Sequence, residues 1–118
     1  IVAQVISKLI DHKMDIDEAI ASPRFSDNLE NMVMYESRIS QNVIREVEKM
    51  GHPIKKLLDY DIKMGGVQGI VYLNDGNIEG SADPRRDGKA IGYWQETYCI
   101  IIYNHLNLSW FMVFYKNE

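Results

Sequence analysis

The sequence predicts a mixed α/β domain of the α+β kind, and three observations support this fold class. Apolar residues recur at helical spacing over residues 1–12 and again over 41–50. A run rich in β-branched and aromatic residues, 67–73, is followed by the turn signal Asn-Asp-Gly-Asn at 74–77. The 118 residues are 46% hydrophobic and 25% charged, a globular composition that suggests one domain or part of one.

Two helices are expected near the start of the chain. The first covers residues 1–12, and its apolar residues share one face: Ile1, Val2, Val5, Ile6, Leu9 and Ile10. Asp15 can cap a second, short helix, with Glu18 three positions later as in a capping box. Pro23 should end this helix, because a proline disfavours the α conformation in the residue before it.

A strand and a third helix are expected next. The strand covers residues 32–36, and Ser40 is the predicted N-cap of a helix over 41–50. The apolar face of that helix would hold Val43, Ile44, Val47 and Met50. Gly51 stands where a left-handed residue commonly follows a helix. Residues 52–60 are less clear, and Pro53 favours an extended entry into this segment.

The second half of the chain reads mainly as strands. The strand at 67–73 should return through its turn to a hairpin partner at 78–82, and the polar segment 83–92 is expected to be a loop. Two apolar runs follow, 98–103 and 110–115. Polar residues divide them, which favours a β-hairpin over a membrane-spanning helix.

The residue pattern predicts no self-contained active site. The three histidines, His12, His52 and His105, lack metal-ligand neighbours at useful spacing, so no metal or cofactor is predicted. Gly65 and Gly66 come without a following lysine, which favours a tight entry into a strand over a phosphate-binding loop. A net charge of -4 without a basic block argues against a nucleic-acid partner.

Two arginines attract attention because each follows a proline. Arg24 follows Pro23, and Arg85 follows Asp83 and Pro84. A proline restricts the path of the chain, and a guanidinium can fork two hydrogen bonds to a carboxylate or to carbonyl oxygens. A structural clamp that holds loops together is the favoured interpretation, with ligand binding as the alternative.

The order of several short segments resembles the end of the small subunit of γ-glutamyltranspeptidases. The segments are 17–25 (DEAIASPRF), the strand that carries Glu36, 50–52 (MGH), 64–70 (MGGVQGI) and 80–93 (GSADPRRDGKAIGY). The resemblance covers residues 1–93 and leaves 94–118 as a divergent hydrophobic tail. It implies the C-terminal portion of a four-layer αββα N-terminal-nucleophile (Ntn) hydrolase sandwich.

The resemblance also implies a chemistry, that of glutathione metabolism. Family members are precursors that cleave themselves, and the new N-terminal threonine transfers γ-glutamyl groups from glutathione-like amides to water or amino acids. In the family, that threonine and the oxyanion glycine pair lie before the position of Ile1, so no catalytic or substrate-binding residue is carried over. Arg24, Asp83 and Arg85 match family motifs for which a structural or maturation-supporting role is expected.

The chain is therefore expected to be inactive alone, as a cut piece of a longer enzyme. Its expected partner is the upstream portion of the same enzyme, or a second copy of itself. Two alternatives stay open: a non-catalytic assembly module that pairs with an upstream fragment, and part of a related hydrolase acting on poly-γ-glutamate or another amide. The sequence gives no indication of localisation.

Overall fold

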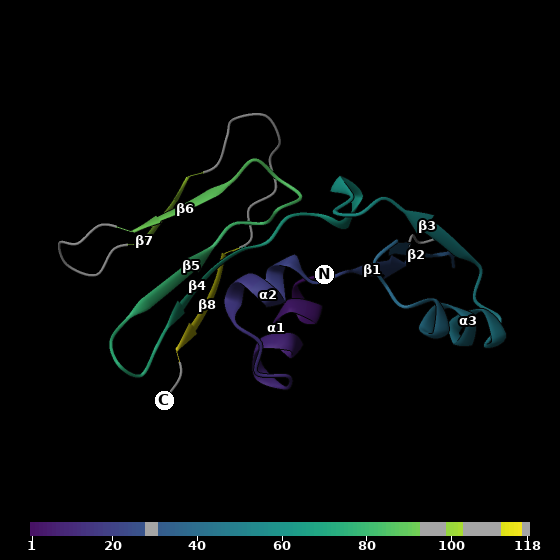
Figure 1. The fold of residues 1–118 in the computed structure, drawn as a ribbon, viewed down its shortest axis with the longest axis horizontal. Helices are drawn as coiled ribbons and strands as arrows, with labels where there is room; N and C mark the ends of the chain where they lie inside the picture. The colour runs from purple at the N-terminus through teal and green to yellow at the C-terminus, as the bar shows by residue number, and fades with distance from the viewer. Residues whose placement is uncertain (28–30, 93–98, 103–111, 117–118) are drawn as a thin grey trace.

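The computed structural model describes residues 1–27, 31–92, 99–102 and 112–116. The helices are α1 (Val2–Ile10), α2 (Ile16–Ala21), α3 (Gln41–Lys49) and the 3-10 helix η1 (Ile62–Met64). The strands are β1 (Phe25–Asp27), β2 (Val33–Glu36), β3 (Ile54–Leu57), β4 (Gln68–Tyr72), β5 (Ile78–Ser81), β6 (Lys89–Gly92), β7 (Cys99–Ile102) and β8 (Met112–Lys116). In the described residues they form three sheets, ordered β1-β2-β3, β5-β4-β8 and β6-β7. The two three-stranded sheets lie at opposite ends of the molecule (Figure 1).

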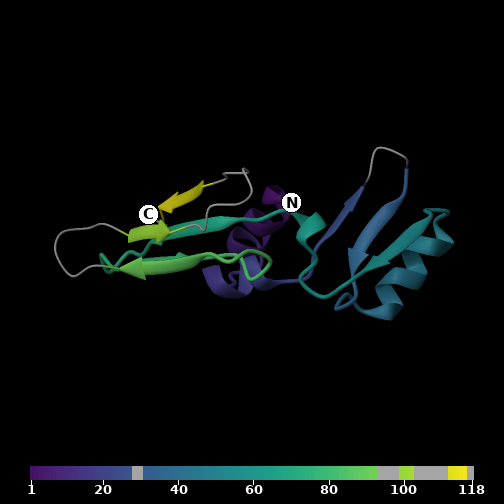
Figure 2. The same cartoon turned by 90° about the horizontal axis from the view of Figure 1, so that it is seen from above.

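Helices α1 and α2 pack together, and α2 packs on β4 and β5 (Figure 2). Asp15 caps α2 as predicted, since its Oδ1 accepts a hydrogen bond of 2.7 Å from the Glu18 N–H. The helix ends at Ala21, before Pro23, also as predicted. The apolar core under these elements consists of Val5, Ile16, Ala19, Ile20, Val67 and Val71.

Gly69 in β4 permits the close approach of α2 to the sheet. A Cβ atom at this position would lie 2.6 Å from Ile16 Cδ1 and 3.1 Å from Ile20 Cδ1. Both isoleucines are buried, so a larger residue would push α2 away from β4. The short distance between α2 and β4 matters below, because the end of α2 forms part of the site.

Strands β2 and β3 run parallel, with α3 between them along the chain. Ser40 occupies the N-cap position of α3 as predicted, although its side chain makes no capping hydrogen bond, and Gly51 follows the helix at φ +88°. The predicted apolar face of α3 is only partly buried: Ile44 is 5% exposed, but Val43 and Met50 are 54% and 74% exposed. Sequence analysis did not predict β1, and it expected an extended chain around Pro53 without assigning the strand β3 that follows it.

Strands β4 and β5 form the predicted hairpin. They pair antiparallel from Gly69↔Ser81 to Tyr72↔Ile78, and Gly76 turns the chain at φ +87°. Gly65 takes the left-handed φ of +68° directly after η1. This conformation leads the chain toward β4, consistent with a tight entry into the strand.

Two predictions for the end of the chain are wrong in detail. Residues 89–92 form β6 rather than part of a loop, and they pair antiparallel with β7. The strands β7 and β8 lie within or near the two predicted apolar runs, but β8 pairs in parallel with β4, so the expected hairpin between them is not formed. An apolar strand pairs with whichever sheet edge lies beside it, and here those edges are β6 and β4. Across the described residues, no helix is long and apolar enough to cross a membrane.

Candidate functional site

Four charged residues form a buried cluster between the two three-stranded sheets. They are Arg24, Glu36 and Asp83, each 0% exposed, and Arg85, which is 4% exposed. We call these four residues the buried cluster. It brings together the two arginines predicted as a clamp, Arg24 and Arg85, and Asp83, for which the resemblance implies a structural role, and it adds Glu36. Ionised side chains are rarely this buried unless they are paired and hydrogen-bonded.

Arg85 and Glu36 make the central pair of the cluster. Arg85 Nε donates to Glu36 Oε1 at 2.6 Å, and Arg85 Nη2 donates to Glu36 Oε2 at 2.5 Å. This two-point arrangement fixes the guanidinium plane as well as its distance. Asp83 orients the Arg85 side chain, because Asp83 Oδ1 accepts hydrogen bonds from both the Arg85 backbone N–H at 2.9 Å and Arg85 Nη1 at 3.1 Å.

Arg24, the residue directly before β1, completes the cluster. Its Nη2 lies 2.7 Å from Asp83 Oδ2, and its Nη1 donates to the Met64 carbonyl at 3.2 Å. The Arg24 N–H donates to Glu36 Oε2 at 3.0 Å, while the Glu36 N–H donates back to the Arg24 carbonyl at 3.0 Å. Each arginine therefore contacts a carboxylate from a distant part of the chain.

The two arginines also satisfy the C-terminal end of α2. The Ile20 carbonyl accepts from Arg24 Nη2 at 2.9 Å and from Arg85 Nη1 at 3.0 Å. The Ser22 carbonyl accepts from Arg85 Nη2 at 2.9 Å. The last carbonyls of a helix have no partner within the helix and carry partial negative charge, so two guanidinium groups are favourable there.

The two carboxylates bind backbone N–H groups of the segment around η1. Val67 N–H donates to Asp83 Oδ2 at 2.8 Å, and Asp61 N–H donates to Glu36 Oε1 at 3.1 Å. The buried cluster thus joins the end of α2, the β1–β2 pair, the segment around η1 and the loop after β5. These segments come from both halves of the described chain.

The cluster shifts the pKa values of Glu36, Arg24 and Arg85. Burial alone would raise the pKa of Glu36, but the hydrogen bonds and charge of Arg85, with help from Arg24 and Arg38, lower it below its ordinary value. Burial lowers the pKa of Arg24, and the charge of Asp83 offsets part of that effect. For Arg85 the bonds to Glu36 and Asp83 outweigh burial and raise the pKa. Charged groups paired with one another in this way suit structural clamping better than proton transfer.

Glu36 was absent from the predicted clamp residues, although the segment resemblance includes it. A usable signal exists in the sequence: this single carboxylate ends an apolar run at 32–36. A charged residue that continues an apolar strand needs a buried partner of opposite charge. In the structure Arg85 is that partner, with Arg38 as a second cation on the same carboxylate.

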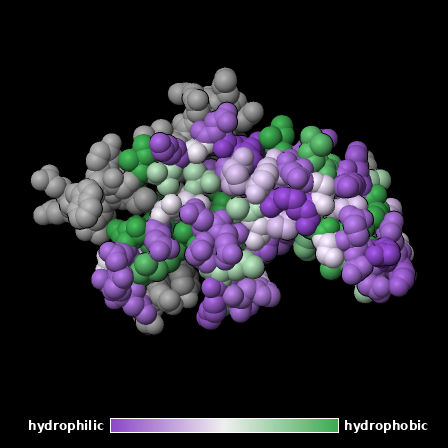
Figure 3. All heavy atoms as spheres, viewed as in Figure 1, coloured by the Kyte–Doolittle hydropathy of each residue, from purple (hydrophilic) through white to green (hydrophobic). Residues whose placement is uncertain are grey.

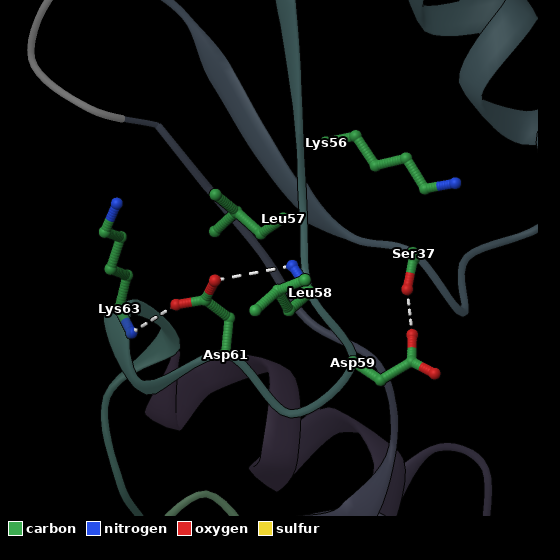
Figure 4. Close-up of a pocket in the computed structure, with 7 residues that line it drawn as sticks. All are labelled: Ser37, Lys56, Leu57, Leu58, Asp59, Asp61 and Lys63. Carbon is green, nitrogen blue, oxygen red and sulfur yellow. Dashed lines mark hydrogen bonds between the residues drawn. The ribbon is translucent and has the colours of Figure 1, made fainter.

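A second candidate site is a shallow, open hollow beside β3. Figure 4 shows that Ser37 points toward Asp59, to which its hydroxyl donates a hydrogen bond, and that Asp61 accepts from the backbone N–H groups of Leu58 and Lys63. Its lining contains no histidine to act as general base for the serine, and the serine hydroxyl bonds to Asp59 rather than to Lys56 or Lys63. The hollow therefore shows no Ser-His or Ser-Lys pair.

The histidines do not form a site in the described part of the chain. His12 and His52 are both exposed, and His105 lies outside the described residues. Among those residues, no group of three or more His, Cys, Asp or Glu side chains could hold a metal ion.

The mixed α/β arrangement matches part of the Ntn-hydrolase fold of solved gamma-glutamyltranspeptidases. The family model described as Gamma-glutamyltranspeptidase matches residues 1–93. The chain belongs to this family.

Two curated relatives and one solved structure illustrate the similarity. The glutathione hydrolase-like YwrD proenzyme of Bacillus subtilis is 31% identical over 94 residues, which cover 75% of this chain and 18% of that protein. The oxamate amidohydrolase proenzyme of Klebsiella pneumoniae is 30% identical over 100 residues, 77% of this chain and 18% of that protein. An acivicin-inhibited gamma-glutamyltranspeptidase is 32% identical with a TM-score of 0.59, over 73% of this chain and 46% of that chain, and its C-terminus has critical roles in autoprocessing and catalysis. The chain spans about a fifth of the length of these curated relatives.

Proposed function

We propose that this chain is the C-terminal part of the small subunit of a gamma-glutamyltranspeptidase-like Ntn hydrolase, and that it serves as scaffold for a site built by the rest of the enzyme. The observation that carries the proposal is the buried cluster. Both Pro-Arg motifs that match the family, around Arg24 and Arg85, use their guanidinium groups on buried internal partners. Groups engaged in this way support neighbouring segments rather than bind substrate.

The enzyme's reaction would be γ-glutamyl transfer from a glutathione-like amide to water or an amino acid. The N-terminal threonine hydroxyl would attack the γ-glutamyl carbonyl carbon and form an ester, and the amine would leave with a proton. Water or an amino acid would then cleave the ester and regenerate the threonine. The similarity to a glutathione hydrolase-like proenzyme supports this class of substrate.

The contribution of this chain would be to hold loops in place during maturation and turnover. Loss of Arg85 would release Glu36, the end of α2 and the loop after β5 together, because it bonds to all three. A misplacement of supporting segments can reduce catalysis even when no reacting group is changed. The roles described for the C-terminus of the acivicin-inhibited relative are in keeping with this proposal.

Turnover of γ-glutamyl-p-nitroanilide tests the proposal. The 118-residue chain alone should release no p-nitroaniline, and co-expression with the polypeptide encoded upstream of Ile1 should produce activity. Arg85→Met should reduce both the self-cleaved product and the activity of that complex. Lys49→Met, which removes an exposed charge from α3, should change neither. Turnover by the pure chain, or equal losses in both variants, would contradict the proposal.

A non-catalytic assembly module is a second candidate, favoured by the exposed apolar side chains near α3 and β3. Leu58 and Ile62 are 75% and 63% exposed, in addition to Val43 and Met50 on α3. In Figure 3 the apolar side chains of the visible face form several separate groups rather than one continuous surface. Turnover of γ-glutamyl-p-nitroanilide by the complex with the upstream polypeptide distinguishes the candidates: a stable but inactive complex favours the assembly module, and an active complex favours the scaffold.

An amide other than a γ-glutamyl compound is the remaining alternative for the enzyme's substrate. The similarity to an oxamate amidohydrolase proenzyme supports it. Comparison of kcat/KM for γ-glutamyl-p-nitroanilide and oxamate in the co-expressed complex decides between the two substrates. A higher value for oxamate would replace the substrate assignment and leave the scaffold role unchanged.

A further inference from the structure

Strand β4 has the composition of a strand inside a sheet rather than at its edge. Its residues, Gln68–Tyr72, include no charged residue and no proline, and Gly69, Ile70 and Val71 are buried in succession. Because side chains alternate between the two faces of a strand, three consecutive buried residues show that both faces of β4 are covered. The strand lacks the charges and prolines that commonly keep an edge strand from pairing with another chain.

The edge strands among the family-matched residues differ from β4 in this respect. Strands β1, β3 and β5 each lie at the end of a described sheet. Each carries an exposed charged side chain: Asp27 on β1, Lys55 on β3 and Glu79 on β5. This contrast indicates that β4 is suited to have a neighbouring strand on each side.

The two neighbours of β4 come from different parts of the chain. Strand β5, within the residues that the family model matches, pairs antiparallel with one edge of β4. The other edge pairs in parallel with β8, from Gln68↔Met112 to Tyr72↔Lys116 (Figure 1). Strand β8 lies outside 1–93, the range of the family match. A relative that shares only the matched range would have to cover this edge of β4 with another segment.

The position of β4 is fixed before any strand joins this edge. Helix α2 packs closely on β4, since a Cβ atom at Gly69 would lie 2.6 Å from Ile16 Cδ1, and Val71 belongs to the apolar core under the helix. A strand that pairs with β4 therefore meets backbone groups that are already ordered, which reduces the entropy cost of binding. An edge of this kind is favourable for backbone pairing with a second polypeptide.

The upstream polypeptide is the partner that the comparisons favour for this edge. The chain covers 46% of the acivicin-inhibited gamma-glutamyltranspeptidase, so more than half of that protein's chain lies outside the matched part and can supply a strand. A second copy of this chain is less suitable. Its edge strands β1, β3 and β5 carry exposed charges, which disfavour pairing with the uncharged β4.

We propose that the edge of β4 held by β8 is a strand-addition site for a β-strand of the upstream polypeptide, and that β8 is a cover that leaves when that strand binds. The inference rests on the proposed function in taking the strand from the upstream part of the same enzyme. Backbone hydrogen bonds supply the binding free energy at such a site. Because only chains with β8 displaced can accept the strand, the cover lowers the apparent affinity for the upstream polypeptide.

Prolines in β8 test the cover. The double substitution Val113→Pro and Phe114→Pro removes two successive backbone N–H groups, one of which faces β4 because these groups alternate between the two sides of a strand. This variant should bind the upstream polypeptide at least tenfold more tightly than the parent chain, measured by isothermal titration calorimetry. The control Asn117→Pro, just beyond β8, should leave the affinity unchanged. Equal affinities of the parent chain and the β8 variant would overturn the inference.

A disulfide that holds β8 on β4 gives the opposite test without breaking the strand. Tyr72→Cys and Lys116→Cys place cysteines at partnered positions of β4 and β8, and Cys99→Ala removes the one other thiol. The oxidised protein should bind the upstream polypeptide at least tenfold more weakly than the same protein after reduction. Equal binding before and after reduction would overturn the inference, and this comparison decides if the proline variant fails to fold.

Turnover of γ-glutamyl-p-nitroanilide by the complexes separates this inference from the proposed function. Tighter binding by the proline variant and weaker binding by the oxidised one, in complexes without activity, would support strand addition and contradict the proposed function. An active complex whose affinity responds to neither change would overturn strand addition alone. No binding by the parent chain or the proline variant would contradict both. A proline variant that forms dimers instead would assign the edge to a second copy and overturn the choice of partner.

Discussion

Two ion pairs of similar length lie in opposite environments in this chain. Arg85 Nη2 and Glu36 Oε2 are 2.5 Å apart with both side chains 0% exposed. On α3, Lys49 Nζ and Glu46 Oε1 are 2.7 Å apart with the side chains 70% and 62% exposed. Distance alone therefore says little about what a pair contributes.

The difference lies in burial and in the number of partners. Glu36 accepts hydrogen bonds from four residues, Arg24, Arg38, Asp61 and Arg85, whereas the α3 pair is a single contact one helical turn apart. A buried pair does not have to make a protein more stable than apolar residues would, because removing charges from water is costly. Removing only one partner, however, leaves the other charge buried and unpaired. The cluster therefore fixes one arrangement of its segments and makes every member difficult to replace.

The largest expected effect comes from Arg85→Met, which leaves Glu36 and Asp83 without their shared cation. We expect a loss of about 3–5 kcal/mol in the free energy of unfolding, measured by urea titration. Arg85→Lys keeps the charge but cannot make two parallel hydrogen bonds to one carboxylate. Its free energy of unfolding should therefore lie between those of the parent chain and Arg85→Met. A loss below about 1 kcal/mol for Arg85→Met would show that the cluster is not a clamp.

Asp83→Asn should have a somewhat smaller effect. The amide keeps one acceptor oxygen but loses the charge that pairs with Arg24 and Arg85, which should cost about 2–3 kcal/mol by urea titration. Protection of the Val67 N–H against hydrogen exchange should fall in the same variant, because that group donates to Asp83. Unchanged protection at Val67 would contradict this role.

Acidification should separate the two pairs further. Because the pKa of Glu36 is lowered in the folded state, its stabilisation is fully present above the ordinary carboxyl pKa of about 4.3 and is lost as the pH falls through the lower folded pKa. When the pH falls from about 6 to about 3, the free energy of unfolding of Glu36→Gln should therefore decrease less than that of the parent chain. If the free energy of unfolding falls with pH equally in the two proteins, groups other than Glu36 cause the acid sensitivity.

The smallest effect is expected at the exposed pair. Lys49→Met should change the free energy of unfolding by no more than about 0.5 kcal/mol. Salt should reduce even that contribution, because exposed charges are screened. If Lys49→Met lost as much unfolding free energy as Arg85→Met, burial would not explain the difference between the two ion pairs.

Local signals predicted most of the helices and the β4–β5 hairpin. The Asp15 cap, Pro23 and Gly51 act on their immediate neighbours, so their effects can be read along the chain. The three-residue β1 is too short for an alternating pattern, and β6 lies in a polar segment, so both depend on partners that sequence does not identify. The partners of β7 and β8 depend in the same way on which sheet edges lie beside them.

The candidate site shows the same limit. The Pro-Arg motifs selected Arg24, Asp83 and Arg85, but the pairing of Arg85 with Glu36 joins β2 to the loop after β5. Such contacts depend on how α2, β2 and β5 pack together. Residue types can indicate that a buried cation needs a partner, whereas the choice among acidic residues requires the fold.

A double-mutant cycle tests the central claim most directly. Unfolding free energies of the parent, Arg85→Met, Glu36→Gln and the double variant give the coupling between Arg85 and Glu36, and the same cycle with Lys49→Met and Glu46→Gln gives the control. The buried-clamp account predicts a coupling of about 2–3 kcal/mol for the first pair and no more than about 0.5 kcal/mol for the second. Equal couplings at the two pairs would contradict it.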